Sequence, residues 1–375
     1  MSTMMRAILI KEGKGPIENL YIGEVEKPVL KEGQVLVKIV AFGLNRMDSL
    51  QREGNYPLPP GASTILGVEF SGRVDYVEPG VTKWSVGDEV FGLSSGGAYA
   101  EYIAADQDLL IRKPPHLSWE DAAGIPENFV TAHQAVTLYG ELKRNDNVLV
   151  HAGASGVGIA AIQMARSFGA RSVTATASNK EKLDWLLSIP SGATEVANYR
   201  TEDFSTTVKN ATDGRGVDVI VDFVGRTHWE KNIDSLALDG RMTILATLSG
   251  EIALDHVATD PNVSRKGGVV PKVDLGPILY KRLKIQGSTL RSRSLEYQSN
   301  LINRCARNFV EFPKVEVKRP CSAAFQDVVS KITGSEGDGP MRVYIHKVFP
   351  WTEIQAAHKE MSDNKNLGKI VCRIS

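Results

Sequence analysis

The sequence predicts a two-domain α/β protein, in which a turn-rich β domain is followed by a doubly wound parallel sheet covered by helices. Three observations lead to this fold class. The chain has 375 residues, a length that suits about two domains. Short apolar runs with a period of two dominate its front part, whereas strand and helix patterns alternate regularly after about residue 119, as they do in parallel sheets.

The front of the chain is predicted to consist of strands separated by tight turns. Alternating apolar runs lie at 6–10, 20–25, 35–40, 69–76, 88–93 and 98–104. Glycine and proline clusters at 13–16 and 28–33, and repeated glycines between 61 and 97, interrupt these runs. Such residues mark turns and bulges. We therefore expect a compact, turn-rich β domain.

The middle of the chain changes to a regular alternation of strands and helices. A helical pattern covers 119–138. Strands are then expected at 147–151, 172–177, 217–221 and 241–245, and helices at 156–168, 180–187 and 228–236. This alternation is typical of a parallel sheet with helices on both faces.

The last segment, 342–375, returns to a strand, a helix at 352–361 and a strand at 368–374, so we expect the C-terminus to complete the first domain. We therefore place the β-rich domain at 1–126 and 293–375, and the helix-covered sheet at 127–292. The polar, glycine-rich stretch 250–276 and the breaker cluster 331–340 are predicted to be loops or insertions.

Charge and cysteine content exclude several classes of protein. Forty-four basic residues balance forty-four acidic ones and there is no long basic run, so nucleic acid and anionic membranes are poor partners. The three cysteines lie in the last fifth of the chain without a close pair, which favours a reducing compartment. Neither a signal peptide nor an apolar run of ~20 residues is present. We expect a cytoplasmic protein without membrane contact.

A glycine-rich turn carries the first functional signal. The segment 146–170, DNVLVHAGASGVGIAAIQMARSFGA, contains an apolar strand, a turn with Gly153, Gly156 and Gly158, and an amphipathic helix. Glycines there let the backbone approach a pyrophosphate, and the first N–H groups of the helix attract the anion. The alternative is a tight turn without a ligand. The succession of strand, turn, helix and second strand favours a dinucleotide.

The end of the second strand indicates which dinucleotide. An NAD site would place an acidic residue there, on the ribose 2′-hydroxyl. This chain instead has Ser178, Asn179 and Lys180, with no carboxylate before Glu181. A hydroxyl, an amide and a lysine suit a 2′-phosphate, so we predict NADPH as the cofactor. In the alternative interpretation, Ser178 caps the following helix and Lys180 is only solvated.

No metal site is predicted. A zinc alcohol dehydrogenase of this layout would need a cysteine in the first domain and a histidine about twenty residues later. The first cysteine of this chain is Cys305 and the first histidine is His116. We therefore expect catalysis without zinc.

Together, these segments resemble the zinc-independent quinone oxidoreductase branch of the medium-chain dehydrogenase/reductase superfamily, the branch that contains zeta-crystallin. The resemblance covers nearly the whole chain. Its motifs include NRMDSLQREGNYPLPPGAS (45–63), PENFVTAHQAV (126–136), HAGASGVG (151–158), NYRTEDF (198–204), THWEKN (227–232) and TEIQAAHKEMSDNKNLGKIV (352–371). Zinc-dependent relatives carry Gly-His-Glu where this chain has Gly67, Val68 and Glu69.

The resemblance implies a fold and a set of site residues. It implies a GroES-like β-rich domain formed by both chain ends, a Rossmann-type domain between them, and a homodimer. Asn45 and Thr131 would border the nicotinamide end of the cleft, while Lys180 and Tyr199 would grip the adenosine phosphate. Tyr199 is equally an ordinary strand-end aromatic. The other expected cofactor-binding residues are Gly153, Ser155, Gly156, Val157, Gly158, Ser178 and Asn366. The chain departs from the family pattern at 250–276 and 307–340.

The implied reaction is hydride transfer from NADPH to a small planar acceptor, a quinone or an enone. Tyr56 and Ser155 are candidates for a hydrogen-bond donor to the acceptor, and Asn45 completes the expected catalytic set. Tyr56 is equally a loop aromatic that covers the site, and Ser155 equally a phosphate-binding or capping residue. A 2-enoyl thioester reductase with Tyr56 as proton donor is the alternative enzyme, and a non-catalytic NADPH-binding protein is the alternative outside catalysis.

Overall fold

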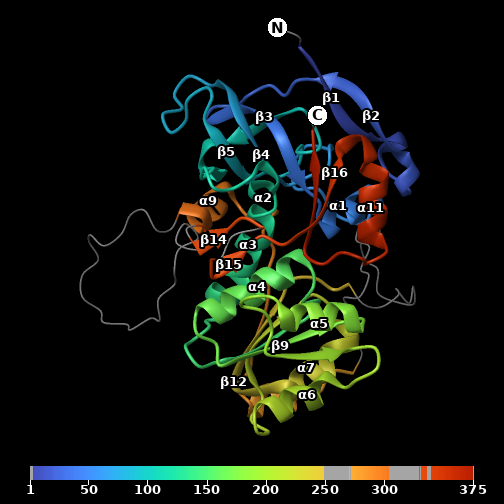
Figure 1. Cartoon of the computed structure of the whole chain (residues 1–375), viewed down its shortest axis with the longest axis vertical. Coiled ribbons are helices and arrows are strands. Elements are labelled where there is room, and N and C mark those ends of the chain that lie inside the picture. Colours follow the sequence, from blue (N-terminus) through green and yellow to red (C-terminus); the bar gives the residue numbers. More distant parts are fainter. Residues whose placement is uncertain are drawn as a thin grey trace, which may run out of the picture.

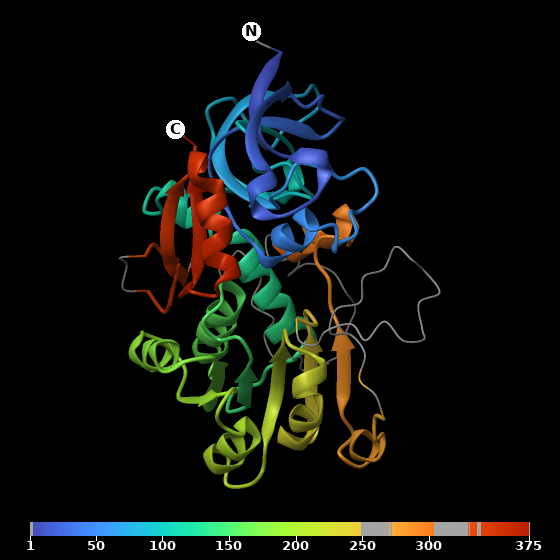
Figure 2. The same ribbon diagram turned by 90° about the vertical axis from the view of Figure 1, so that its right-hand side faces the viewer.

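The computed structural model describes residues 3–248, 270, 272–303, 329, 331–335 and 339–374. Two bodies lie one above the other, with the β-rich domain at the top and the helix-covered parallel sheet below it (Figure 1). A view turned by 90° shows the red C-terminal segment beside the blue N-terminal strands (Figure 2). Both chain ends therefore contribute to the β-rich domain.

The main sheet of the β-rich domain has the order β16-β17-β3-β4-β5-β7, with β6 paired to β3. Its strands are β3 (Gln34–Gly43), β4 (Glu69–Val77), β5 (Glu89–Leu93), β6 (Tyr102–Asp106), β7 (Leu110–Arg112), β16 (Ile345–Pro350) and β17 (Lys369–Arg373). A separate antiparallel pair is formed by β1 (Met4–Ile10) and β2 (Leu20–Glu26). The last strand, β17, pairs antiparallel with the end of β3. The C-terminus thus completes the first domain, as the sequence predicts.

The second sheet is parallel and has the strand order β10-β9-β8-β11-β12-β13. Its strands are β8 (Asn147–Val150), β9 (Ser172–Ala177), β10 (Glu195–Asn198), β11 (Val217–Asp222), β12 (Leu236–Ile244) and β13 (Lys284–Gly287). Successive strands are added outward from β8 on one side and outward from β11 on the other, so the strand order reverses between β8 and β11, which is the Rossmann arrangement. In such sheets, ligands bind at the carboxyl ends of the strands beside this reversal.

Helices cover both faces of the parallel sheet and join it to the β-rich domain. The helices α1 (Arg46–Arg52), α2 (Trp119–Ala123) and α11 (Ile354–Ser362) belong to the β-rich domain. The helices after α2 and before α11 are α3 (Pro126–His133), α4 (Gly156–Ser167), α5 (Lys180–Ser188), α6 (Phe204–Ala211), α7 (Trp229–Ser235), α8 (Gly276–Tyr280) and α9 (Leu295–Asn303). The short strands β14 (Ile332–Thr333) and β15 (Met341–Arg342) pair beside α4. Packing of α3 against α4 continues the apolar core from one domain into the other.

Three expected elements differ from the structure. The segment 98–104 forms a strand only from Tyr102 onward. The backbone N–H of Tyr99 donates to the Leu66 carbonyl, and the Tyr99 carbonyl accepts from the Ile8 N–H, so this residue does not pair with β3. The helical pattern at 119–138 divides into α2, α3 and a π-helix at Gln134–Tyr139. Pro126 lacks a backbone N–H and therefore begins a new helix. Strand β12 begins earlier than expected, at Leu236.

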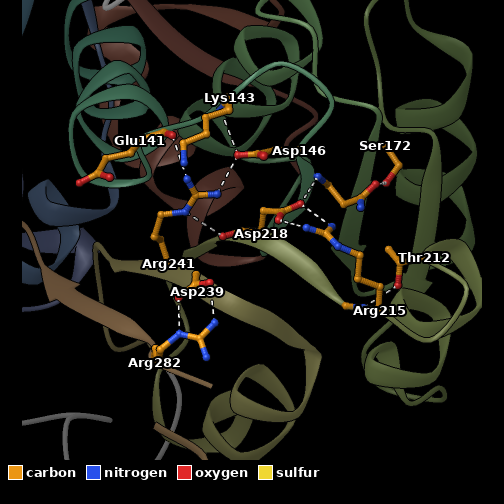
Figure 3. A network of polar contacts seen from close by, with 12 residues as sticks. Glu141, Lys143, Asp146, Ser172, Thr212, Arg215, Asp218, Asp239, Arg241 and Arg282 are labelled. Carbon is orange, nitrogen blue, oxygen red and sulfur yellow. Dashed lines mark hydrogen bonds and ion pairs between the residues drawn. The ribbon is translucent and has the colours of Figure 1, made fainter. Parts of the chain in front are cut away.

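A polar network fastens the amino-terminal ends of β8 and β11, at the opposite end of the sheet from the glycine turn (Figure 3). Arg241 forms a mostly buried ion pair with Asp146 at 2.7 Å and donates to the Asp218 carbonyl. The Asp218 carboxylate accepts hydrogen bonds from Arg215 and from the Asn147 backbone N–H. This network holds the strands together without using the ligand-binding end.

The two predicted insertions lie mostly outside the described residues. The stretch 250–276 is described only at 270 and from 272 onward, and 307–340 only at 329, 331–335 and 339–340. The expectation that these segments are loops therefore stays a prediction.

Candidate active site

A cavity with a volume of about 880 Å³ lies between the two domains. We call it the interdomain cavity. The glycine turn after β8 and the end of β9 form its lower wall, α1 and β17 its upper wall, and α3 runs along it. Clefts of this size at the carboxyl ends of such sheets are typical ligand sites.

The glycine turn between β8 and α4 contributes the N-terminus of α4 to the cavity. Ser155 is the N-cap, and its hydroxyl accepts a hydrogen bond from the Gly158 N–H at 3.0 Å. Ser155, Gly156 and Val157 line the cavity, whereas Gly153 and Gly158 lie behind it. The first turn of a helix offers free N–H groups and a partial positive charge to an anion.

The close packing of this turn explains its glycines. A Cβ atom at Gly156 would lie 2.6 Å from the Asn128 amide nitrogen, and one at Gly158 would lie 2.3 Å from the Ala152 carbonyl oxygen. A side chain at Gly158 would therefore displace the backbone of the turn, whereas one at Gly156 would displace the buried side chain of Asn128. The bare backbone at Gly156 faces the cavity, as a pyrophosphate site requires.

The structure does not bring Lys180 to the cavity. Its ammonium group is exposed and pairs with Asp184 one turn later on α5, at 2.6 Å. Lys182 lines the cavity instead, as does Ser178. Asn179, and not Ser178, caps the helix by accepting from the Lys182 N–H at 2.9 Å. Helical side chains lean toward the N-terminus of their helix, which directs the third residue of α5, rather than the first, to the strand end.

Positive charge gathers at this end of the cavity. Tyr199 and Arg200 line it together with Lys182. Burial lowers the pKa of Lys182, and the nearby charges of Arg46 and Arg200 lower it further. The Lys182 ammonium donates to the backbone carbonyl of Asn364 at 2.5 Å. Because that partner is uncharged, the positive charge of Lys182 is not neutralised by this contact.

Asn45 belongs to a buried polar cluster at the opposite end of the cavity. Its side-chain amide donates to Glu69 at 2.8 Å, and its oxygen accepts from the Lys369 ammonium at 2.7 Å. Lys369 and Glu69 form a buried ion pair. Asn45 also caps α1 together with Asp48. Because Asn45 and Lys369 both line the cavity, this cluster fixes two polar groups against a bound ligand.

Tyr56 lines the same end of the cavity, beneath a buried arginine. The Arg291 guanidinium lies 5.4 Å from the centre of the Tyr56 ring. Arg291 also donates to the Gln51 side chain at 2.8 Å and to the Ser95 carbonyl, and thereby joins the segment after β13 to the β-rich domain. Burial raises the pKa of Tyr56, so its hydroxyl stays protonated near neutral pH.

The remaining expected residues, Thr131 and Asn366, also line the cavity. Asn366 donates to the carbonyl of Gly368, whose N–H bonds to the Ala154 carbonyl in the glycine turn at 2.8 Å. The loop before β17 is therefore attached to the phosphate-binding turn.

Several lining residues besides Lys182 and Arg200 were not among the sequence-based candidates, and three charged ones concern the substrate end. Glu127 and Arg291 face the substrate end, and Lys369 faces Asn45. Glu127 is 5% exposed, and burial together with the charge of Glu69 raises its pKa to about 8. No local motif identifies these residues, since their position depends on how distant segments pack. The only sequence signal was their presence in PENFVTAHQAV, TLRSR and NLGKIV.

The residues present fit a dinucleotide cofactor. The glycine cradle would hold the pyrophosphate, the cations beside β9 would face the adenosine end, and Asn45 with Thr131 would border the nicotinamide. Within the described ranges, no group of three or more His, Cys, Asp or Glu side chains is arranged to hold a metal ion. No described helix is long and apolar enough to cross a membrane.

Two family models match the chain. The model described as "Alcohol dehydrogenase GroES-like domain" matches residues 31–115, and the model described as "Zinc-binding dehydrogenase" matches residues 156–307. The first falls on the β-rich domain and the second begins at the N-terminus of α4.

Curated relatives and solved structures agree with this assignment. A quinone oxidoreductase of Sus scrofa is 31% identical over 245 residues, which cover 65% of this chain and 74% of that protein. A 2-haloacrylate reductase of a Burkholderia species is 30% identical and covers 98% of both chains. The structure of a mycobacterial protein complexed with NADPH is 28% identical, covers 98% of this chain and 99% of that one, and superposes with a TM-score of 0.76.

The β-rich and Rossmann domains, the glycine cradle between them and these matches lead to one assignment. The chain belongs to the quinone oxidoreductase branch of the medium-chain dehydrogenase/reductase superfamily, whose members are nicotinamide-dependent oxidoreductases.

Proposed function

We propose that the protein is an NADPH-dependent, zinc-independent reductase that transfers hydride to a quinone or a similar planar, electrophilic carbonyl compound. The observation that carries this proposal is the continuity of the interdomain cavity from the phosphate-binding turn to Tyr56 and Arg291. When bound, the nicotinamide ring supplies the hydride. The protein then has to hold the acceptor over that ring, exclude water and stabilise the negative charge that develops.

The cations at the adenosine end support NADPH as the preferred cofactor. Lys182 and Arg200 line the cavity near the end of β9, where an NAD site would carry a carboxylate. A charge-assisted hydrogen bond contributes ~1.5–3 kcal/mol, which corresponds to about a tenfold to hundredfold preference. The NADPH complex of the similar mycobacterial structure supports the same choice.

The substrate end of the cavity offers hydrogen-bond donors to an acceptor. The Tyr56 hydroxyl and the Asn45 region lie on the β-rich side, and the Arg291 charge lies above the tyrosine ring. A quinone is already electrophilic, so it needs positioning and stabilisation of the oxyanion that forms. The named activity of the Sus scrofa relative supports a quinone as the acceptor.

Zinc-independent catalysis is supported by the composition of the first domain. Val68 occupies the position of a zinc-binding histidine, and no cysteine precedes Cys305. Residues 1–126 of this domain therefore supply no cysteine and only His116 as soft ligands for zinc. Hydride transfer to a quinone does not require a metal-bound alkoxide.

A second candidate function is the reduction of an activated carbon–carbon double bond, for example in an enone or 2-enoyl thioester. The Burkholderia relative, matched over nearly its full length, is named for reduction of a 2-haloacrylate. Tyr56 keeps its proton near neutral pH, as the acid in such a reaction must. A non-catalytic NADPH-binding protein is the remaining alternative.

An anaerobic assay separates these functions. The purified protein is mixed with NADPH and an ortho-quinone, a trans-2-enoyl thioester or a 2-haloacrylate, and loss of nicotinamide absorbance is followed. We expect fast oxidation with the quinone and at least tenfold slower oxidation with NADH in place of NADPH. Turnover of the enoyl thioester or haloacrylate alone would favour the second candidate, and NADPH binding without turnover would favour the non-catalytic alternative.

The variant Tyr56→Phe sharpens the test. It should reduce quinone turnover only several-fold, because the ring remains and the oxyanion has other partners. It should abolish enoyl reduction if Tyr56 is the obligatory acid there, a loss of about 100-fold or more. Equal losses in both reactions would contradict this distinction.

We also propose a homodimer formed through the edge of the parallel sheet. Within the described part of the chain, β13 pairs only with β12. The adjacent segment carries the large exposed apolar side chains Leu275, Leu279 and Tyr280, which are 67%, 70% and 77% exposed. An open edge beside an apolar patch is suited to pairing with a second copy.

A further inference from the structure

We propose that Glu127 is a further catalytic residue, which enters the reaction as a protonated acid and gives its proton to the reduced acceptor. This inference rests on the proposed reductase function and adds the source of the proton. It is carried by the position of the Glu127 carboxyl in the interdomain cavity and by the absence of a strong partner for it within the described residues.

Glu127 is the second residue of α3 and faces the substrate end of the cavity. Its side chain lines the cavity together with Tyr56, Asn45 and Thr131. Only 5% of the residue is exposed. Thr131, which borders the predicted nicotinamide position, lies one turn further along the same helix. The carboxyl is therefore placed beside the region where the acceptor must lie during hydride transfer.

Glu127 and the neighbouring Glu69 have very different partners. The Glu69 carboxylate pairs with the Lys369 ammonium and accepts hydrogen bonds from the Asn45 amide and from the Glu127 backbone N–H, each at 2.8 Å. The Glu127 side chain has one long contact, from the Thr131 hydroxyl at 3.5 Å. The polar partners of Glu69 hold its carboxylate in place, whereas the Glu127 carboxyl keeps most of its hydrogen-bonding capacity for a ligand.

The charges around Glu127 also favour its protonated form. Burial is the main cause of its raised pKa, which reaches about 8, and the charge of Glu69 is the next cause. Asp48 on α1 raises this pKa further, while the cations of Lys369 on β17 and Arg291 after β13 lower it. Burial and the two carboxylates together outweigh the two cations, so the net effect is a raised pKa of Glu127.

Tyr56 is the neighbouring candidate for the acid. Burial raises the pKa of Tyr56 above its ordinary value of 10.0, and the charge of Glu127 raises it further. An acid works best near the pH at which the enzyme operates. Glu127 therefore matches neutral pH better, and Tyr56 is left to orient the acceptor.

The proton balance of the step is complete without another reagent. The acceptor receives a hydride, which carries two electrons, and an oxyanion or enolate forms. The O–H bond of Glu127 breaks, and a new bond to that proton forms on the reduced acceptor. The Glu127 carboxylate left behind recovers a proton from water when the product leaves. A quinone is thereby converted to a hydroquinone.

The test compares the wild-type protein with Glu127→Gln and Glu127→Asp. Glutamine keeps the shape and a hydrogen-bond donor but has no transferable proton, whereas aspartate keeps a shorter acid. Exposed Glu32, outside the cavity, provides the matched control Glu32→Gln. Each protein is assayed for kcat/KM with NADPH and an ortho-quinone between about pH 5 and pH 10, and for NADPH affinity by nicotinamide fluorescence.

We expect wild-type kcat/KM to fall with an apparent pKa of about 8. Glu127→Gln should lose about 100-fold or more of kcat/KM at neutral pH and should lack this fall, with NADPH affinity changed less than about threefold. Glu127→Asp should recover part of the rate, and Glu32→Gln should match the wild type. If Glu127→Gln keeps the rate and the pH dependence, or if Tyr56→Phe removes that dependence instead, the proposal is wrong.

A spectroscopic measurement tests the protonation state without turnover. Infrared difference spectra of the NADPH complex should show a carboxyl C=O band that is lost above about pH 8 and is missing from Glu127→Gln. Absence of the band at pH 6 would overturn the proposal. An active wild type with an unchanged Glu127→Gln variant would refute only the role of Glu127. If the wild-type protein fails to oxidise NADPH with any of the tested acceptors, the proposed function and the role of Glu127 are both refuted.

Discussion

Lys180 and Lys182 lie two positions apart on α5 but have different surroundings. Lys180 is exposed and paired with Asp184, whereas Lys182 is 9% exposed and lines the cavity. The missing carboxylate led us to expect a lysine at the strand end, but the sequence could not show which of the two lysines points into the interdomain cavity. The starting point of the helix decides this, and Asn179 sets it by capping.

The pair therefore gives a controlled test of cofactor recognition. Lys182→Ala should weaken NADPH binding by about 10- to 100-fold, because a charge-assisted contact to the 2′-phosphate is lost. NADH binding should hardly change. Lys180→Ala is the control and should leave both affinities intact. Titration of nicotinamide fluorescence measures the dissociation constants of NADPH and NADH for both variants. A larger effect from Lys180→Ala than from Lys182→Ala would contradict the placement of Lys182 at the 2′-phosphate.

The sequence predicted those parts of the site whose shape is determined by one local segment. The glycine turn at 153–158 is such a segment, since its residues and its neighbours are adjacent in the chain. Glu127, Arg291 and Lys369 come from three distant segments that meet only in the folded protein. A glutamate after a proline at a helix start normally suggests only a favourable helix terminus, so its burial beside a second carboxylate could not be predicted locally.

At the scale of elements, the period-two runs and the strand–helix alternation predicted both sheets well. Boundaries failed where tertiary contacts override the local pattern. The strand expected at 98–104 begins only at Tyr102 because residues before it are held by Ile8 and Leu66. The helix pattern at 119–138 is interrupted because Pro126 starts a new helix.

The outer strand of the parallel sheet leads to a prediction about assembly. If β13 and the patch of Leu275, Leu279 and Tyr280 form the dimer interface, Leu279→Asp should weaken dimerisation by about 100-fold or more, because it buries an unpaired charge. Val29 is 88% exposed in the β-rich domain, and Val29→Asp is the matched control. Sedimentation velocity over a range of concentrations distinguishes the two variants. A dimer unchanged by Leu279→Asp would place the interface elsewhere.

For the whole molecule, buried histidines predict how stability depends on pH. Burial lowers the pKa of His133, His151 and His228 to about 4 and that of His358 to about 3. Unfolding lets these groups take up protons below their ordinary value of 6.5, so the folded state loses stability as the pH falls below it. Each histidine contributes a slope of up to about 1.4 kcal/mol per pH unit.

Two carboxyls act in the opposite direction. Burial raises the pKa of Asp48 to about 6 and that of Glu127 to about 8. Their protonated forms are favoured in the folded state, so their contribution is lost as the pH rises toward these values. Below pH 6.5, the effect of the four histidines on the free energy of unfolding is larger than that of the two carboxyls, so stability rises with pH. At higher pH, the effect of Glu127 lowers stability as the pH rises. We therefore expect the urea midpoint to be highest at about pH 7, where the two opposing proton uptakes cancel. A midpoint that rises steadily from pH 5 to pH 9 would contradict this balance.

The position of β17 in the first sheet has a consequence for biosynthesis. Lys369 bonds to Asn45 across 324 positions of the chain, and the end of β3 pairs with β17. While the ribosome is still translating the middle of the message, the emerging first domain has an open strand edge and an unneutralised Glu69. Such edges associate readily with other chains. We therefore expect a polypeptide terminated before residue 369 to associate with other chains, since it would lack both the β17 strand beside β3 and the Lys369 partner of Asn45.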